Sequence, residues 1–302
     1  MEFHSDIIGI GYCSVDYLCL VPYIPQDDKV EIIQTIVQGG GPAATAIVAA
    51  ARLGAKTALI STYGDDERGK SIRDGLAAEG INIKAMKLRK GTESPAAFCW
   101  IEKAGGKRSI VWTKGNVEAL SPDEVDIEMI KKAKVLHLDG HQTEAAIAAA
   151  QIARKNKVTV SIDAGTIVPG IEKLLGLSDI IIASEKFALR YTGEADMEDA
   201  AKKLFKFNCI FSAVTMGEKG SIGFDGKNIL RCPAFKVHAI DTTGAGDVFH
   251  GAFIYKYLSG GNWTECINFA SAVSALKCTK FGGRTGIPRL SETEKFLSEK
   301  GF

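Results

Sequence analysis

Residues 241–247, Asp-Thr-Thr-Gly-Ala-Gly-Asp, place a carboxylate inside a glycine-rich turn. Gly244 and Gly246 permit backbone conformations that other residues resist, and the missing side chains leave amide N–H groups uncovered. Apolar residues at helical spacing follow over 248–255, which predicts a helix that starts in this turn. A helix N-terminus is an anion site because its first amides lack partners and its dipole favours negative charge. Asp247 would repel a phosphate there unless it takes a proton from a substrate hydroxyl, so the segment indicates phosphoryl transfer.

A second glycine cluster, Gly39-Gly40-Gly41 followed by Pro42, lies in the N-terminal part of the sequence. Each glycine loses much conformational entropy on folding, so three in a row indicate backbone that packs close to a ligand, with an ordinary turn as the alternative. Pro42 suits the first turn of a helix, which we expect over 43–53 with Gly54 as its C-terminal cap.

Other nucleotide-binding patterns are absent from the sequence. There is no G-x-x-x-x-G-K-[ST] P-loop and no protein-kinase motif set. Gly9-Ile10-Gly11 lacks the later glycine of the dinucleotide fingerprint, which argues against NAD. The net charge of +1 gives no global attraction to nucleic acid or to anionic membranes. No apolar run approaches the length of about 18 residues that a membrane span needs. We therefore expect neither a nucleic acid nor a membrane as partner.

The seven cysteines have irregular spacing and form no C-x-x-C pair. This pattern predicts free thiols in a reducing compartment and argues against zinc binding. The first residues lack the basic and long apolar segments of a signal peptide, so we expect a cytoplasmic protein. A length of 302 residues with 46% hydrophobic and 24% charged residues is typical of one large α/β domain, alone or with a small appendage.

Buried-strand patterns alternate with helical ones along most of the chain. They predict strands at 7–11, 57–61, 135–138, 158–162, 179–183 and 211–215, and helices at 43–53, 67–79 and 144–156. This alternation predicts a parallel sheet with helices on both faces and right-handed crossovers. Ligands of such sheets bind at the carboxyl ends of the strands, where we expect Asp16, Asp163 and Gly217.

Two further segments predict a small separate sheet. Residues 17–37, which two prolines interrupt, are expected to form short exposed strands. Residues 96–101 and 108–112 flank Gly105-Gly106 and predict a β-hairpin. We expect the two segments to form a lid over a cleft.

These motifs resemble, in their order and over nearly the whole chain, those of the PfkB, or ribokinase-like, carbohydrate kinases. Residues 241–249 are similar to the C-terminal signature of that family, and Gly39-Gly40-Gly41 with its helix is similar to the family's glycine motif on the sugar side. Residues 63–69 resemble the next motif of the family, and residues 215–220 resemble its nucleotide-side loop.

The resemblance implies a ribokinase-like fold, which is a three-layer α/β/α domain of Rossmann type with a small β-sheet lid. The whole chain, 1–302, would form this single domain, with the lid built from approximately 13–37 and 95–114.

The resemblance also implies roles for individual residues. Asp247 would be the general base, and the amides of Gly244, Ala245, Gly246 and Asp247 would form an anion hole for the transferred phosphoryl group. On the sugar side, Asp16 would bind hydroxyl groups, with an exposed turn acid as the alternative interpretation. The backbone of Gly40 and Gly41 would contact the sugar.

ATP with Mg²⁺ is the phosphoryl donor that the resemblance implies. The nucleotide would lie between the loop after one strand and a C-terminal helix, at Thr215, Gly217, Gly220, Asn268, Ala272 and Ala275; for the alanines, simple packing is the alternative. A monovalent cation, K⁺, would be bound near the anion hole at Asp241, Thr243, Gly282 and Gly286.

Two positions depart from the family pattern. Thr45 stands where many members carry Asn, in the sugar-side segment. Residues 184–187, Ser-Glu-Lys-Phe, stand where many carry an N-x-x-E motif that helps to organise Mg²⁺. Glu185 is the acid left nearby, and it would reach Mg²⁺ through water or remain a surface acid.

The combined segments look most similar to bacterial ketose kinases of the fructose and sulfofructose type. Lys29 falls where such an enzyme could hold an anionic group, but the segments around Trp112 and His141 do not reproduce a polar anion-binding set. We therefore expect an uncharged ketose or related sugar. Trp100 and Trp112 on the predicted lid could stack on a flat ring, which keeps a nucleoside substrate as an alternative, or could pack in the lid core.

A non-catalytic sensor of sugar or nucleotide is the alternative from another functional class. The intact segment 241–247 argues against it, and the departure at 184–187 favours it. The apolar residues Leu18, Leu20 and Ile33 of the lid permit a homodimer through this sheet.

Overall fold

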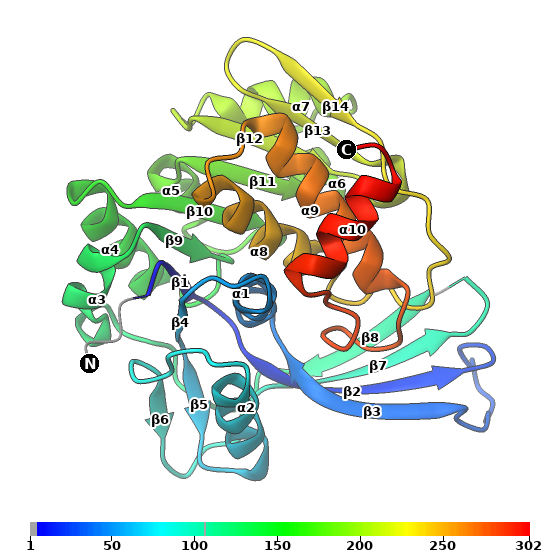
Figure 1. Ribbon diagram of the computed structural model, residues 1–302. Helices are drawn as coiled ribbons and strands as arrows, with labels where there is room; N and C mark the ends of the chain where they lie inside the picture. Colours follow the sequence, from blue (N-terminus) through cyan, green and yellow to red (C-terminus); the bar gives the residue numbers. More distant parts are fainter. Residues whose placement is uncertain (1–4, 106) are drawn as a thin grey trace.

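The computed structural model describes residues 5–105 and 107–302, and Figure 1 shows a three-layer α/β/α domain from which a smaller sheet projects. The central sheet has eight strands in the order β14-β13-β12-β11-β10-β9-β1-β4. Their bounds are β1 (Ile7–Ile10), β4 (Thr57–Ile60), β9 (Val135–Leu138), β10 (Thr159–Ala164), β11 (Ile180–Ser184), β12 (Phe211–Thr215), β13 (Ser221–Phe224) and β14 (Ile229–Cys232).

Helices cover both faces of this sheet. One face carries α1 (Pro42–Arg52), α8 (Ala245–Leu258), α9 (Trp263–Cys278) and, outside them, α10 (Leu290–Glu299), all at the front of Figure 1. The other face carries α3 (Ile127–Lys132), α4 (Thr143–Lys155), α5 (Ile171–Leu177), α6 (Glu185–Thr192) and α7 (Met197–Phe205). Two short 3₁₀ turns, η1 (Pro122–Glu124) and η2 (Gly217–Lys219), complete these connections.

Each face of the sheet has its own apolar core. The inner strands are apolar on both sides, as in β1, whose residues are all buried, and this is the pattern of a sheet covered twice. The alanine-rich α1 has eight buried residues and packs closely against both β1 and α8. The small side chains bring the helix axis near the sheet, which places its N-terminus beside the carboxyl end of β1.

The expectation of a wholly parallel sheet was wrong at one edge. The pairs β12–β13 and β13–β14 are antiparallel, whereas the other pairs of this sheet, including β11–β12, are parallel. The connection from β12 to β13 is only the short turn η2, and a parallel pair would need a crossover of a dozen or more residues.

The lid is a four-stranded sheet in the order β3-β2-β7-β8, at the lower right of Figure 1. Its strands are β2 (Ser14–Val21), β3 (Gln34–Gly40), β7 (Ala96–Glu102) and β8 (Arg108–Thr113). A second small sheet pairs β5 (Thr62–Gly64) with β6 (Lys87–Arg89) next to α2 (Glu67–Ala78). The predicted hairpin is confirmed, while Gly106 of its turn lies outside the described residues.

The first lid strand lies within the predicted segment, but the second continues beyond the predicted limit at residue 37. The chain leaves β1 and enters β2 at Ser14, so Asp16 belongs to the lid and not to the end of the first core strand. Likewise β3 continues through Gly39 and Gly40, which are paired with Val15 and Ser14. The glycine cluster is therefore the end of a lid strand, and Gly41 alone makes the turn into α1.

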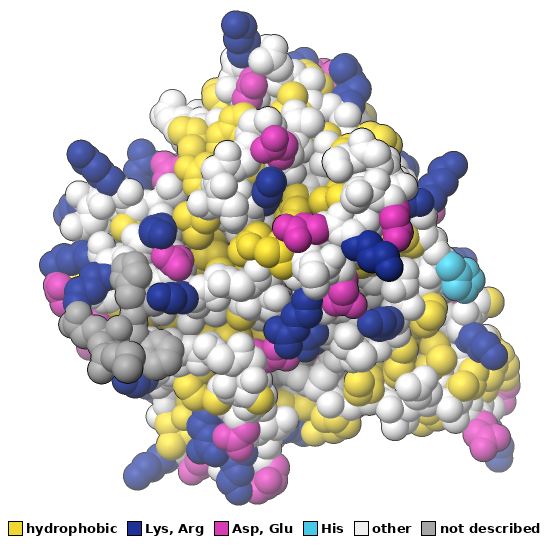
Figure 2. Space-filling view, viewed as in Figure 1, with side chains coloured by type: hydrophobic (Ala, Val, Ile, Leu, Met, Phe, Trp, Pro, Cys, Tyr) yellow, Lys and Arg dark blue, Asp and Glu magenta, His cyan; other side chains and the backbone are white. Residues whose placement is uncertain are grey.

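The surface has no strongly charged face in the view of Figure 2, where Lys and Arg side chains are scattered and apolar groups lie among them over the lid. All seven cysteines are free thiols, as predicted. Within the described part of the chain, no helix has both the length and the apolar character needed to cross a bilayer.

Candidate functional site

The predicted anion turn lies at the N-terminus of α8, at the carboxyl-end edge of the sheet. Gly244 is the N-cap residue with a φ of 73° and gives no side-chain cap to the helix, so the conformation that favours glycine is used here. The Ala245 N–H donates to the carbonyl oxygen of Thr242 at 3.2 Å. A side chain on Gly246 would meet open space. A phosphoryl group therefore has room beside Gly246 at the first turn of α8.

Asp247 follows directly in the first turn of α8 and is half-buried. Burial, and after it the negative charge of Asp163, raises the pKa of Asp247 to about 7. A carboxylate with such a pKa accepts a proton well at neutral pH, which suits a general base. The charge of His250 acts in the opposite direction.

Asp163 lies next to the end of β10, close to Asp247, and forms an ion pair within the protein interior. His250 Nε2 lies 3.1 Å from Asp163 Oδ1, and both side chains are almost completely buried. Burial alone would raise the pKa of Asp163, but the charge and hydrogen bond of His250 lower it below its ordinary value. His137 on β9 lies beside His250 with ring centroids 5.7 Å apart, and burial lowers its pKa to about 3. Asp163 therefore stays ionised.

Each glycine of the cluster has a separate steric reason. A Cβ on Gly39 would collide with Nη1 of Arg284, and a Cβ on Gly40 would collide with the carboxylate of Asp16. Gly41 has a φ of 92°, and a Cβ there would collide with the carbonyl oxygen of Tyr12. Two of the glycines thus make room for charged side chains.

Asp16 and Arg284 lie close together next to Gly40, where the sequence predicts the sugar to bind. Arg284 Nη2 donates to the carbonyl oxygen of Gly40 at 2.9 Å, and its Nε donates to Thr45 Oγ1 at 3.2 Å. Asp16 accepts a hydrogen bond from Ser14 Oγ at 2.8 Å. Burial raises the pKa of Asp16, while the Ser14 hydrogen bond and the charge of Arg284 oppose this shift. Arg284 itself is 7% exposed.

Asp139 is a structural anchor that the sequence analysis missed. Its Oδ2 accepts the N–H groups of Tyr12 at 2.8 Å and Ala43 at 3.0 Å, and its Oδ1 accepts that of His141 at 2.9 Å. A Cβ on Gly11 would collide with this carboxylate. Asp139 therefore joins the ends of β1 and β9 to the N-terminus of α1. An aspartate directly after a buried strand, as at Asp163, was the available signal.

The residues predicted for the nucleotide lie on the other side of the anion turn. Thr215 ends β12, and Gly217 and Gly220 follow it with φ values of 59° and 90°. The helix α9 runs alongside α8, and Ser274 Oγ donates to the carbonyl oxygen of Ala245 at 2.8 Å. On this helix Asn268 and Ala275 are partly exposed, whereas Ala272 is buried among its neighbours.

Glu185, at the start of α6, is paired with a lysine rather than free. Lys219 Nζ lies 2.9 Å from its Oε1, at the carboxyl ends of β11 and β12. In the described part of the chain, no group of three or more His, Cys, Asp or Glu side chains is arranged to hold a metal ion. The described residues therefore contain no ready-made protein cage for Mg²⁺, an ion that is usually bound through substrate phosphates and keeps several waters.

The four residues predicted to bind a monovalent cation converge in one place. Asp241 Oδ1 accepts the Thr243 N–H at 2.8 Å, and its Oδ2 accepts the Gly282 N–H at 2.9 Å. A Cβ on Gly286 would collide with the carbonyl oxygen of Lys277. The buried ammonium of Lys277 lies next to Asp241, and its Nζ donates to the carbonyl oxygen of Asp241 at 2.7 Å.

Lys29 does not join the site. It is exposed in the connection between β2 and β3, whereas Asp16 lies near the other end of β2. The two tryptophans separate as well. Trp112 pairs with Ala97, which pairs with Asp16, so these residues share one face of the lid. Trp100 lies three residues after Ala97 on β7, so its side chain is on the opposite face of the lid.

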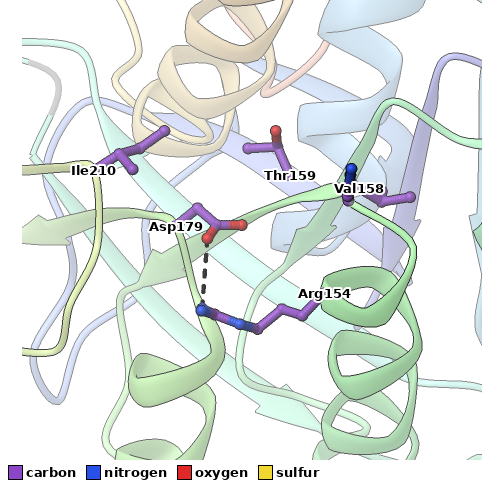
Figure 3. Close-up of a pocket in the computed structure, with 6 residues that line it drawn as sticks. Arg154, Val158, Thr159, Asp179 and Ile210 are labelled. Carbon is purple, nitrogen blue, oxygen red and sulfur yellow. Dashed lines mark hydrogen bonds and ion pairs between the residues drawn. The ribbon is translucent and has the colours of Figure 1, made fainter.

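A shallow hollow of about 240 Å³ lies at the opposite edge of the sheet, before the amino ends of β10, β11 and β12. Figure 3 shows Arg154 from α4 facing Asp179 across it, with Nη1 3.4 Å from Oδ1. Ligands of such sheets bind at the carboxyl ends, so this hollow is not the functional site.

Comparison with known proteins shows which families and proteins are similar to this chain. The family model described as pfkB family carbohydrate kinase matches residues 5–290. Ribokinase of Haemophilus influenzae is 34% identical over 304 residues, covering 95% of this chain and 97% of that protein. Nucleoside kinase of Methanothermobacter thermautotrophicus is 26% identical and covers all of this chain and 99% of its own. Probable fructokinase-5 of Arabidopsis thaliana is 27% identical, covering 93% and 95%.

Solved structures have the same fold. A putative ribokinase from Agrobacterium tumefaciens superposes with a TM-score of 0.89 at 28% identity and 98% coverage of both chains. A putative ribokinase II from E. coli, in complex with ATP and Mg²⁺, superposes with a TM-score of 0.86 at 25% identity, covering 98% and 99%.

Proposed function

The chain belongs to the pfkB family of carbohydrate kinases, and we propose that it transfers the γ-phosphate of ATP to a hydroxymethyl group of a small uncharged sugar, with ketoses as the first class to test. As a member it is a phosphotransferase with an alcohol group as acceptor, acting on a sugar or a nucleoside. The ATP complex of the E. coli relative supports ATP with Mg²⁺ as the donor.

The observation that carries the proposal is the position of Asp247 in the first turn of α8. Its carboxylate has a pKa of about 7. Asp247 directly follows Gly246, where a Cβ would meet open space. In the proposed reaction a sugar hydroxyl gives its proton to Asp247 while its oxygen attacks the γ-phosphorus, and ADP leaves. The first-turn amides would stabilise the charge on the transferred group, which is the main contribution that phosphoryl transfer asks of a protein.

The sugar-side charges support an uncharged acceptor. Arg284 is committed to Gly40 and Thr45, and its positive charge offsets that of Asp16. The pair therefore carries no net charge, and the Asp16 carboxylate can accept a hydrogen bond from a sugar hydroxyl. Lys29, which would have favoured an anionic sugar, lies elsewhere on the surface.

A nucleoside acceptor is the second candidate because aromatic rings gather near Asp16 and Asp139. Tyr12 contacts His141 with ring centroids 5.1 Å apart and Trp112 with centroids 6.4 Å apart. Trp112 is 62% exposed on the lid face that carries Asp16. A flat base could stack on it.

The lid also supports pairing of two copies of the chain. One row across the four strands consists of Val37, Tyr17, Phe98 and Val111, all on the face that points away from Asp16. Val37 and Val111 are 56% and 57% exposed. Leu18 and Leu20, named from the sequence for this role, are instead buried in the lid's own core. We propose that the outward row, and not these leucines, forms a homodimer contact.

A substrate panel tests the proposed function. ADP release is measured with ATP, Mg²⁺ and d-fructose, d-ribose, ribose 1-phosphate or adenosine. We expect turnover of at least one neutral sugar. Turnover of adenosine alone would favour the nucleoside candidate, and turnover of ribose 1-phosphate alone would contradict an uncharged acceptor. Binding of these ligands without any turnover would indicate the sensor.

A further inference from the structure

The side-chain ammonium of Lys277 lies in the interior of the protein. It lies in the last turn of α9, and none of its surface is exposed. Its Nζ donates to the carbonyl oxygen of Asp241 at 2.7 Å. Asp241 is equally buried, and its two carboxylate oxygens accept the N–H groups of Thr243 and Gly282.

A buried ammonium is retained only when its charge is compensated, because desolvation of an unpaired charge is very costly. Burial lowers the pKa of Lys277, and the charge of Asp241 is the largest influence in the opposite direction. The ammonium therefore lies within the electrostatic influence of the Asp241 carboxylate, although its hydrogen bond is made to the backbone carbonyl of Asp241. Removing the lysine would leave Asp241 as an uncompensated buried carboxylate.

This pair is directly connected to the anion turn. Asp241 binds the backbone of Thr243, and Thr243 precedes the N-cap residue Gly244. Gly283, which follows Gly282, contacts Gly244 from the other side. A positive charge held here fixes the backbone that forms the anion site and adds a favourable field where negative charge develops.

The four residues that family resemblance suggests for K⁺ do not fit an added ion. The ammonium of Lys277 already lies beside Asp241, where it is bound to the backbone carbonyl oxygen of that residue. An ammonium and K⁺ carry the same charge, and both are bound by carbonyl and carboxylate oxygens. A second cation beside Lys277 would meet repulsion in a desolvated site.

We propose that the Lys277 ammonium is the built-in monovalent cation of this site, so that the enzyme needs no K⁺. The effect of the Lys277 charge on catalysis rests on the proposed function, whereas the exclusion of K⁺ from this site does not. Lys277 is a positioning residue that acts through Asp241 and the turn at Gly244.

The first test uses the unaltered protein. Activity is measured with the best acceptor of the panel and thermal unfolding is followed, each in choline chloride and at rising KCl with ionic strength held constant. We expect the same kcat, KM and Tm throughout. A several-fold rise in activity, or a Tm that rises with KCl but not with choline chloride, would overturn the proposal. The Tm measurement needs no turnover, so its result stands even if no sugar is phosphorylated.

Two variants test the charge itself. Lys277→Ala removes the ammonium and leaves room, so kcat should fall by about tenfold or more in choline chloride and should recover in part with KCl or ethylammonium chloride. Lys277→Met removes the charge but fills the space, so its loss should not be rescued. KCl should raise the Tm of the alanine variant only.

Full activity of Lys277→Ala in choline chloride would contradict the proposal, as would equal rescue of both variants. If the alanine variant does not fold, an unfolded CD spectrum identifies that outcome, and the behaviour of the unaltered protein in KCl decides the question.

Discussion

The imidazole Nε2 of His250 lies 3.1 Å from Oδ1 of Asp163. His250 follows Asp247 by one helical turn in α8. This buried pair fixes an ionised carboxylate beside Asp247, the proposed general base. Its charge adds to the effect of burial and raises the pKa of Asp247 into the neutral range. Burial and the charge of Asp163, a residue outside the signature at 241–247, therefore act together to raise the basicity of Asp247.

Replacing the base should separate catalysis from binding. Asp247→Asn removes the proton acceptor, so kcat should fall by about 10²–10⁴-fold, while the affinity for ATP measured by calorimetry should change little. An Asp247→Asn variant that keeps wild-type kcat would remove Asp247 from the mechanism.

The same variant should be more stable than wild type at alkaline pH. The pKa of Asp247 is about 7 in the folded state and 3.8 ordinarily, so the folded state holds a proton that the unfolded chain releases. Stability from this group is therefore present at low pH and is lost as the pH rises toward 7. The Tm of Asp247→Asn should exceed that of wild type at pH 8, and the difference should shrink toward pH 5. An equal difference at both pH values would contradict this assignment.

The pH profile should report the charge of Asp163. Asp247 acts as a base when ionised, so kcat/KM should fall as the pH drops below about 7. Asp163→Asn removes the neighbouring negative charge and should move this acidic limb to lower pH. The other charged groups that influence Asp247 are His250, Asp16 and Asp139. A limb that stays in place in Asp163→Asn would mean that burial alone sets the pKa.

Arg284 should control sugar affinity. Arg284→Gln breaks the hydrogen bonds to Gly40 and Thr45 and removes the charge near Asp16. We expect the KM for sugar to rise by about tenfold or more, as for lost charged hydrogen bonds, with the KM for ATP nearly unchanged. Arg52→Gln is the matched control, since Arg52 Nη1 holds the carbonyl oxygen of Arg284 in the same loop. If both variants raise the KM for sugar equally, Arg284 acts only by anchoring this loop.

The outward lid row should determine the oligomeric state. Val37→Asp combined with Val111→Asp places two charges on that row, and sedimentation velocity should show a shift from dimer to monomer. Leu18→Ala changes the buried lid core instead and should lower the Tm without the same change in mass. A wild-type protein that sediments as a monomer at all concentrations would contradict the proposed contact.

The sequence predicted the features that local chemistry determines. The turn before α8, the helix after Pro42 and the alternating strands and helices follow from glycine conformation, helix capping and periodicity. It could not place Asp16, because an extended segment that continues from β1 into β2 has no local mark at the point where it changes sheets.

Contacts between residues that are distant in the sequence could not be predicted either. Arg284 meets Gly40 across 244 positions, and Lys277 meets Asp241 across 36. A lysine near the end of an amphipathic helix is usually exposed, and nothing in its neighbours' sequence reveals that Lys277 is buried. Asp139 differs, since its place after a buried strand gave the same signal as Asp163.

The most direct test of sugar phosphorylation with Asp247 as the base compares acceptor-dependent ADP release by the wild-type protein and by Asp247→Asn. The assay contains ATP, Mg²⁺ and d-fructose or d-ribose, and mass spectrometry identifies the product. The account predicts a sugar monophosphate formed by the wild type and a kcat lower by about 10²-fold or more in the variant. Sugar and ATP that bind to the wild type without forming a sugar phosphate or ADP would contradict it.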